Sequence, residues 1–168
     1  MDADVWRIHA RGDPDLEDAM LRDHVVAVGG HELGDLSHGP ELEDLRDELR
    51  DQFPERTDRG IANFVGYWRQ FLYDMQPGDV VALSLSGSRV AIGRVTGGYA
   101  YRLSAPDRIR HARAVEWLAS DIPRGRFDRD MKATLDSRET ICRIRASGRS
   151  DACSPPPRLA WTPAHRPS

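Results

Sequence analysis

The chain has little cysteine and no long apolar run, and each scarcity excludes a class of protein. Only two cysteines occur in 168 residues, Cys142 in the strand-like TICRI segment and Cys153 in a proline-rich tail, so neither a disulfide framework nor a zinc site is predicted. No apolar stretch approaches the roughly 20 residues that cross a bilayer. The first residues, MDADVW, are acidic where a secretory signal would be basic. The sequence therefore predicts a cytoplasmic protein without a membrane partner.

Familiar motifs for catalysis and cofactor binding are also scarce. Gly93, Gly97 and Gly98 do not form a phosphate-binding fingerprint, because no helix is predicted to follow them. His31 and His38 lack the i, i+4 helical spacing that aligns two metal ligands. No Ser-His-Asp or Cys-His arrangement stands out. We therefore predict no catalytic residue, no metal and no cofactor.

One catalytic alternative remains open, a small metal-dependent nuclease. Pro106-Asp107 and Asp130-Met-Lys132 form a loose version of a nuclease pattern in which carboxylates hold Mg²⁺ and a lysine orients water. However, Asp107 falls in a predicted loop, and Asp130 and Lys132 stand at the start of a predicted helix. Acidic residues are favoured there by the helix dipole, so the structural interpretation is the better one.

Charge is distributed unevenly along this chain, whose net charge is −3. Residues 13–58 contain fifteen Asp or Glu and four Arg, a balance of −11, whereas residues 89–129 contain nine Arg and four acids, a balance of +5. A basic half favours phosphate contact, although arginines on a solvated face explain the same excess, since Lys132 is the only lysine. The candidates for phosphate binding are Arg94, Arg102, Arg108, Arg110, Arg113, Arg124 and Arg126.

Hydrophobic periodicity and turn residues predict an α+β fold. Strands are expected at 5–8, 25–30, 80–85, 90–97, 99–102, 112–118 and 139–145. Helices are expected at 14–22, 40–53, 61–75 and 128–135. The short SGSR connection forces antiparallel pairing of its two flanking runs. This order favours a small, strongly bent sheet or barrel with helices outside it, rather than an alternating βαβ array.

A change of composition divides the chain. Residues 1–145 are predicted to form one domain, and residues 146–168, rich in Pro, Ser and Arg without periodicity, to form a disordered tail.

Aromatic residues beside glycines and arginines are the remaining functional signal. Trp6, Trp68, Tyr99 and Tyr101 are each typical of a core when taken singly. As a group, flat aromatic walls beside small residues can accept a flipped nucleobase by stacking, with arginines holding the phosphates.

The order of motifs resembles a known family. VWRIHARG, VVAVGGHELGDLS, IANFVGYWRQF, QPGDVVAL, VAIGRVTGGYAY, HARAVEWLASDIPRGRFDRD and ETICRI are similar, over residues 5–144, to the N-terminal domain of bacterial Mrr-like restriction endonuclease proteins. That domain resembles the PUA superfamily, which includes the EVE, YTH, ASCH and SRA-like modules. The resemblance implies a PUA-like pseudo-barrel of about six strands with three to four flanking helices.

The resemblance also implies a function, the reading of a modified base everted from DNA, or of a modified nucleotide in RNA. DNA is preferred, as part of a modification-dependent restriction system. The Pro-rich tail stands where the family continues into a nuclease, so we expect no enzyme activity here and a separately encoded nuclease as a possible partner. The predicted base pocket comprises Trp6, Trp68, Tyr99 and Tyr101 as walls and His31, Asp35 and Ser37 as readers of polar base edges.

An interaction subunit is the alternative from another class of protein. In that interpretation the acidic helix at 40–53 docks a basic partner protein and the pocket is vestigial.

Overall fold

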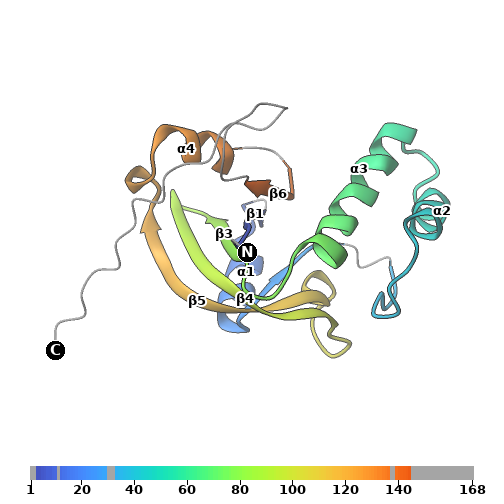
Figure 1. Ribbon diagram of the computed structural model, residues 1–168, viewed down its shortest axis with the longest axis horizontal. Helices are drawn as coiled ribbons and strands as arrows, with labels where there is room; N and C mark the ends of the chain where they lie inside the picture. The colour runs from blue at the N-terminus through green and yellow to red at the C-terminus, as the bar shows by residue number, and fades with distance from the viewer. Residues whose placement is uncertain (1–2, 11, 30–32, 137–138, 145–168) are drawn as a thin grey trace.

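The computed structural model describes residues 3–10, 12–29, 33–136 and 139–144, which form a bent six-stranded sheet with four α-helices around it (Figure 1). The strands are β1 (Val5–His9), β2 (Val25–Ala27), β3 (Val80–Leu85), β4 (Arg89–Tyr101), β5 (His111–Pro123) and β6 (Ile141–Ile144). The α-helices are α1 (Pro14–Arg22), α2 (Leu42–Gln52), α3 (Asp58–Arg69) and α4 (Arg129–Leu135). The remaining helical turns are a π-helix, η1 (Gln70–Asp74), and two 3₁₀ turns, η2 (Asp107–Ile109) and η3 (Arg124–Arg126). The predicted α+β class, with a bent sheet of six strands and flanking helices, is confirmed.

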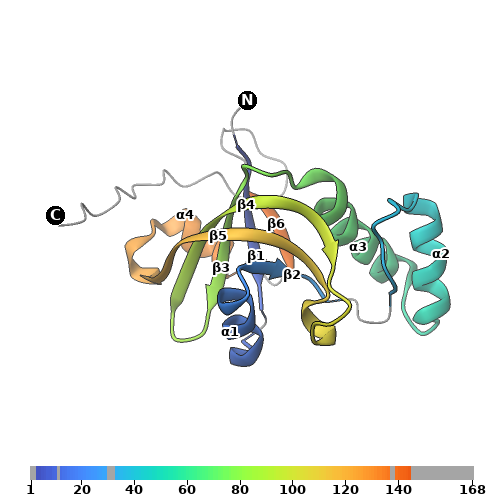
Figure 2. The ribbon, with the colours of Figure 1, turned by 90° about the horizontal axis from the view of Figure 1, so that it is seen from below.

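The strand order in the sheet is β2-β5-β4-β3-β1-β6. β1 and β3 are parallel, and every other pair in this order is antiparallel. β4 and β5 are 13 residues long and curve together across the molecule, with α4 at one end of the sheet and the α2–α3 pair at the other (Figure 2). The predicted antiparallel pairing across SGSR is confirmed, and Gly87 takes the positive φ, 71°, that this turn requires.

The two strands expected at 90–97 and 99–102 are one continuous strand, β4. Gly97 and Gly98 do not interrupt it; instead the register with β5 shifts between Val95 and Tyr99, and the glycines lie in this irregular stretch. A bulge lets a strand bend without ending, which the sequence pattern alone did not separate from a turn. Gly93 has a different role, since a Cβ there would lie 2.4 Å from Val115 Cγ1, so close packing of β4 on β5 requires glycine.

Both faces of the sheet are covered. The larger core continues from one face of the sheet to α1 and to the α2–α3 pair at the end of the sheet, and its largest buried side chains include Trp6, Met20, Leu49, Ile61 and Phe71. A second cluster lies beneath α4 and joins Ala82, Val90, Ile92, Ile122, Met131, Leu135 and Ile144. No helix among the described residues has the length and apolar character to cross a membrane.

Helix α3 begins and ends earlier than the helix expected over 61–75. Thr57 caps its start, because the hydroxyl oxygen accepts a hydrogen bond from the Gly60 amide at 3.1 Å. After Arg69 the backbone widens into η1, where the Met75 amide donates to the Gln70 carbonyl at 2.9 Å. The expected helix over 61–75 is therefore an α-helix followed by a π-turn, a feature common at sites of functional or packing constraint.

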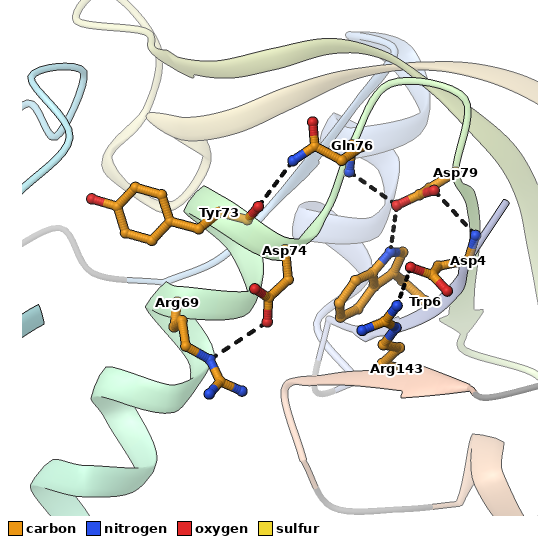
Figure 3. Close-up of polar contacts among 8 residues, drawn as sticks. All are labelled: Asp4, Trp6, Arg69, Tyr73, Asp74, Gln76, Asp79 and Arg143. Atoms are coloured by element: carbon orange, nitrogen blue, oxygen red, sulfur yellow. Dashed lines mark hydrogen bonds and ion pairs between the residues drawn. The ribbon is translucent and has the colours of Figure 1, made fainter. Parts of the chain in front are cut away.

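Asp79 connects this π-turn to the sheet (Figure 3). Its buried carboxylate accepts hydrogen bonds from the Trp6 indole at 2.9 Å, the Gln76 amide at 2.9 Å and the Asp4 amide at 3.1 Å. Its backbone carbonyl accepts from the Val95 amide at 2.8 Å. One residue thus joins the end of η1 to β1, β3 and β4.

Replacing Asp79 with alanine is expected to lower the free energy of unfolding by about 3 kcal/mol, because three donors lose their acceptor and two of them are at buried or half-buried positions. Urea denaturation followed by circular dichroism measures this loss. The matched control is Asp74→Ala, which removes a partly exposed ion pair with Arg69 and should cost less than about 1 kcal/mol. Equal losses for the two variants would contradict the role assigned to Asp79.

Candidate functional site

A cavity of about 390 Å³ opens between the sheet and the α2–α3 pair. The sheet side is built from chain segments that leave the ends of β1 and β2, and the helix side from α3 and the end of α2. Its lining residues are His9, Ala10, Leu16, Ala27, Val28, Gly29, Leu33, Leu49, Phe53, Arg56, Phe64, Tyr67, Trp68, Arg108 and Thr140. Most of this surface is apolar, and aromatic residues supply the helix side.

The cavity forms because β1 and β2 are short and the α2–α3 pair lies beyond their ends. β2 has only three residues and β1 five, so the sheet ends early at this corner. α2 packs on α3 through its buried Leu45 and Leu49, and the pair lies beside the sheet instead of over it (Figure 1). The space between them is filled only in part by side chains.

The aromatic wall of the cavity has a defined geometry. Phe53 and Phe64 are stacked, with ring centroids 5.7 Å apart and an angle of 11° between planes. Tyr67 meets Phe64 edge to face at 6.4 Å. Trp68 is 3% exposed and shows the cavity only a small part of its ring. Such a wall suits a flat, apolar ligand, because aromatic rings pack well in offset or edge-to-face arrangements.

Two arginines add positive charge to the lining. The Arg56 guanidinium lies 4.3 Å from the Phe64 ring centroid and 5.4 Å from that of Phe53, a cation–π arrangement. Within the described residues Arg56 has no carboxylate partner. Arg108, in contrast, forms an ion pair with Asp13. The lining can therefore accept an anionic or electron-rich group next to its aromatic wall.

Among the predicted pocket walls, only Trp68 lines this cavity. Tyr99 and Tyr101 lie with Trp68 around the buried His111: the ring centroids of Trp68 and Tyr101 are 4.9 and 5.2 Å from that of His111. The Tyr99 hydroxyl lies 2.7 Å from His111 Nδ1 and accepts from the Leu36 amide at 3.2 Å. These residues form a packed polar cluster beside the cavity.

The other predicted pocket residues are placed elsewhere. Trp6 is fully buried, with its indole bonded to Asp79 and the Arg143 guanidinium 5.6 Å from its ring. Asp35 and Ser37 are exposed and bonded to one another, and the hydrogen bonds from Ser37 hold the pKa of Asp35 below its ordinary value. None of these three lines the cavity, and His31 lies outside the described residues.

Arg113 does not serve as a phosphate ligand on the surface, because it is buried, with 3% exposure, under the π-turn. Its guanidinium donates to the carbonyls of Phe71 at 2.7 Å, Leu72 at 3.0 Å and Gly97 at 3.3 Å. Burial lowers the pKa of Arg113, and the charge of Asp79 opposes that shift. The inward-facing position of residue 113 in β5 gives it a structural role that the charge count could not indicate.

The other six predicted phosphate ligands divide into two groups. Four have acidic partners, in the pairs Arg102–Asp23, Arg108–Asp13, Arg110–Asp107 and Arg124–Asp136. Arg94 and Arg126 are exposed and form no ion pair within the described part of the chain. Only these two present an uncompensated charge to solvent.

The residues of the nuclease alternative do not come together. Asp107 lies in η2, immediately before β5, whereas Lys132 lies in α4, beyond the other end of that 13-residue strand. Asp107 is paired with Arg110 at 2.7 Å, and the side chain of Asp130 lies outside the described residues. No group of His, Cys, Asp or Glu suited to a metal ion occurs among the residues that the structure describes.

Sequence reasoning missed most of the cavity. Five of its lining residues are not among those that the sequence predicts for a pocket: Gly29, Phe53, Arg56, Phe64 and Tyr67. The available signal was the close spacing of Phe53 and Arg56 in the turn between the two helices, followed by aromatics on one face of α3. The sequence pattern alone does not show that these aromatic residues line a cavity, because this depends on the angle between the helix pair and the sheet.

Comparison with known proteins assigns the family. The chain belongs to the family described as "Domain of unknown function (DUF8426)", which matches residues 6–145. No curated protein matches its sequence. Its structure is similar to the YTH domain of the Zygosaccharomyces rouxii MRB1 protein, solved in complex with N6-methyladenosine RNA, with a TM-score of 0.43 and 14% identity over 86% of this chain and 80% of that chain. The resemblance to Mrr-like proteins stays a prediction.

Burial raises the pKa of Tyr99 to about 12. Because the neutral phenol is favoured in the folded state, its contribution to stability is complete below pH 10, the ordinary tyrosine pKa, and is lost as the pH rises towards 12. Absorbance titration at alkaline pH should show a late-ionising tyrosine that is missing in Tyr99→Phe. The control is Tyr101→Phe, which should retain the latest step; its loss there would contradict the assignment to Tyr99.

Proposed function

We propose that this protein is a non-enzymatic reader of nucleic acid that holds one modified base in the cavity between the sheet and the α2–α3 pair. The observation that supports it is the aromatic cavity itself, with Phe64 and Tyr67 in its wall and, beside them, Arg56, which has no carboxylate partner in the described part of the chain. Its volume of about 390 Å³ lies in the lower part of the roughly 300–1,000 Å³ range of small-molecule pockets. A nucleoside is a ligand of that scale.

A nucleobase suits the chemistry of this wall. It is flat, so it can stack on an aromatic ring, and the Arg56 guanidinium can stack on its other face or contact the adjoining phosphate. An added methyl group is apolar and suits the aliphatic part of the lining, from Leu33 and Leu49. A base reaches such a cavity only after leaving its stack, so the ligand is a single-stranded or everted nucleotide.

We further propose DNA as the preferred nucleic acid and a modification-dependent restriction system as the context. The support is the sequence resemblance to the N-terminal domain of Mrr-like proteins. A separately encoded nuclease would then cut DNA that this protein marks.

Charge determines the side from which nucleic acid can approach. The outer face of α2 exposes five acids and repels phosphates: Glu43, Asp44, Asp47, Glu48 and Asp51. Arg108, in contrast, joins the cavity to the η2 region, where Arg110 is also located. We place the sugar–phosphate backbone on that side of the cavity.

The salt dependence of binding should be shallow, because most arginines already have acidic partners. Seven phosphate contacts would give a slope of log K against log salt of about −6, whereas two to three contacts give about −2. Fluorescence anisotropy with a labelled oligonucleotide at several salt concentrations measures the slope. A slope near −6 would show that the ion pairs open on binding and that phosphates supply most of the affinity.

Filling the cavity tests the proposal directly. Gly29 lines it, and a Cβ at this residue meets nothing within 4 Å, so Gly29→Leu adds bulk without disturbing the core. We expect at least a tenfold loss of affinity for oligonucleotides carrying 5-methylcytosine, 5-hydroxymethylcytosine or N6-methyladenine, whichever the wild-type protein prefers, with unmodified DNA and the matching RNA as comparisons. Gly125→Leu, at an equally open glycine in η3, should bind as the wild type does.

An equal loss in both glycine variants, or no preference of the wild-type protein for any modified oligonucleotide, would contradict a base pocket. The interaction-subunit alternative then becomes the better one, since the exposed acids of α2 could dock a basic protein. Loss of partner binding on replacing Glu43, Asp47 and Asp51 with their amides would support it.

A further inference from the structure

A second hollow, of about 360 Å³, lies between α3 and the segment that leads into β6. It is lined by Ala62, Asn63, Gly66, Tyr67, Gln70 and Glu139. Its character differs from that of the first cavity, because amide and carboxylate side chains replace most of the aromatic surface.

The two hollows adjoin at Tyr67. This residue lines both, and Glu139, in the second hollow, is followed directly by Thr140, which lines the first. They therefore meet where α3 faces the segment that leads into β6. The half-buried Tyr67 side chain therefore stands between the two hollows.

The chemistry of the second hollow suits a base edge and not a phosphate. The Gln70 amide nitrogen donates to the Gly66 carbonyl at 3.2 Å, which fixes the side chain along the helix and leaves its amide oxygen as an acceptor. Asn63 is exposed two turns before Gln70 and lines the same hollow. Amide groups pair with the N6 and N7 edge of adenine, and a carboxylate such as Glu139 accepts from the amino group of cytosine but repels phosphate.

We propose that this second hollow binds the base next to the modified one and prefers adenine or cytosine, whose exocyclic amino groups meet the acceptors of Asn63, Gln70 and Glu139. The proposal rests on the base-reading function of the first cavity. Tyr67 would separate the two bases, as aromatic side chains do when a single strand is splayed for recognition. The protein then reads a short sequence context together with the modification.

Gly66 offers a clean way to close the second hollow. A Cβ there meets nothing within 4 Å, and glycine in a helix interior is less favourable than alanine. Gly66→Met should therefore keep or improve the stability of α3 while it occupies the floor of the hollow. Ala133→Met, at an exposed residue of α4, is the matched control.

The experiment compares a modified nucleoside monophosphate with trideoxynucleotides that carry the same modified base in the middle and A, C, G or T on each side in turn. In isothermal titration calorimetry the wild-type protein and Ala133→Met should favour A or C on one side by about fivefold or more. Gly66→Met should lose that preference and bind the monophosphate as before. Asn63→Ala should weaken the preference for adenine more than that for cytosine.

Each outcome separates the two proposals. Binding of the monophosphate without any preference for the neighbouring base, or a preference that persists in Gly66→Met, overturns the second hollow alone. Failure of the wild-type protein to bind either ligand above its affinity for unmodified DNA overturns the base-reading function, and this inference with it.

Discussion

The position of the α2–α3 pair relative to the sheet depends on two buried ionic side chains at the π-turn. Asp79 receives donors from β1 and from the end of η1, while Arg113 donates to two carbonyls of η1 and to Gly97 in β4. A buried carboxylate and a buried guanidinium are tolerated because each has several hydrogen-bond partners. Removing one partner leaves the other groups unsatisfied, so this connection permits little change of angle. The shape of the cavity depends on this angle between the α2–α3 pair and the sheet.

The cavity and the second hollow both depend on the π-turn that follows α3. The π-turn ends α3 against the sheet, so the helix extends away from the sheet and carries Phe64 and Tyr67 at the open corner. The lack of a side chain at Gly29 and Gly66 keeps both spaces open, although neither glycine is required for the backbone. Glycine at these places is better explained by the space it leaves than by folding.

The sequence predicts what depends on short segments. The bounds of α1, the turn at Gly87 and the antiparallel pairing of the strands that flank it follow from local pattern, and they agree with the structure. The roles of residues that contact distant parts of the chain cannot be predicted from local sequence patterns. The sequence does not distinguish Arg113 from a surface arginine, because its burial depends on the pairing of β5 with β2 and β4. Phe53 and Phe64 are separated by ten residues, and only the packing of α2 on α3 stacks their rings.

The basic and acidic halves of the chain form ion pairs with one another within the fold. Arg102 and Arg108, in the basic half, bond to Asp23 and Asp13, which flank α1 in the acidic half. Hydrogen bonds from Arg102 and Arg22 hold the pKa of Asp23 below its ordinary value. The excess of arginine over residues 89–129 is therefore largely neutralised within the fold and does not form a broad field for nucleic acid. A ligand that is held despite a net negative charge has to be held by shape and stacking, and the aromatic cavity provides both.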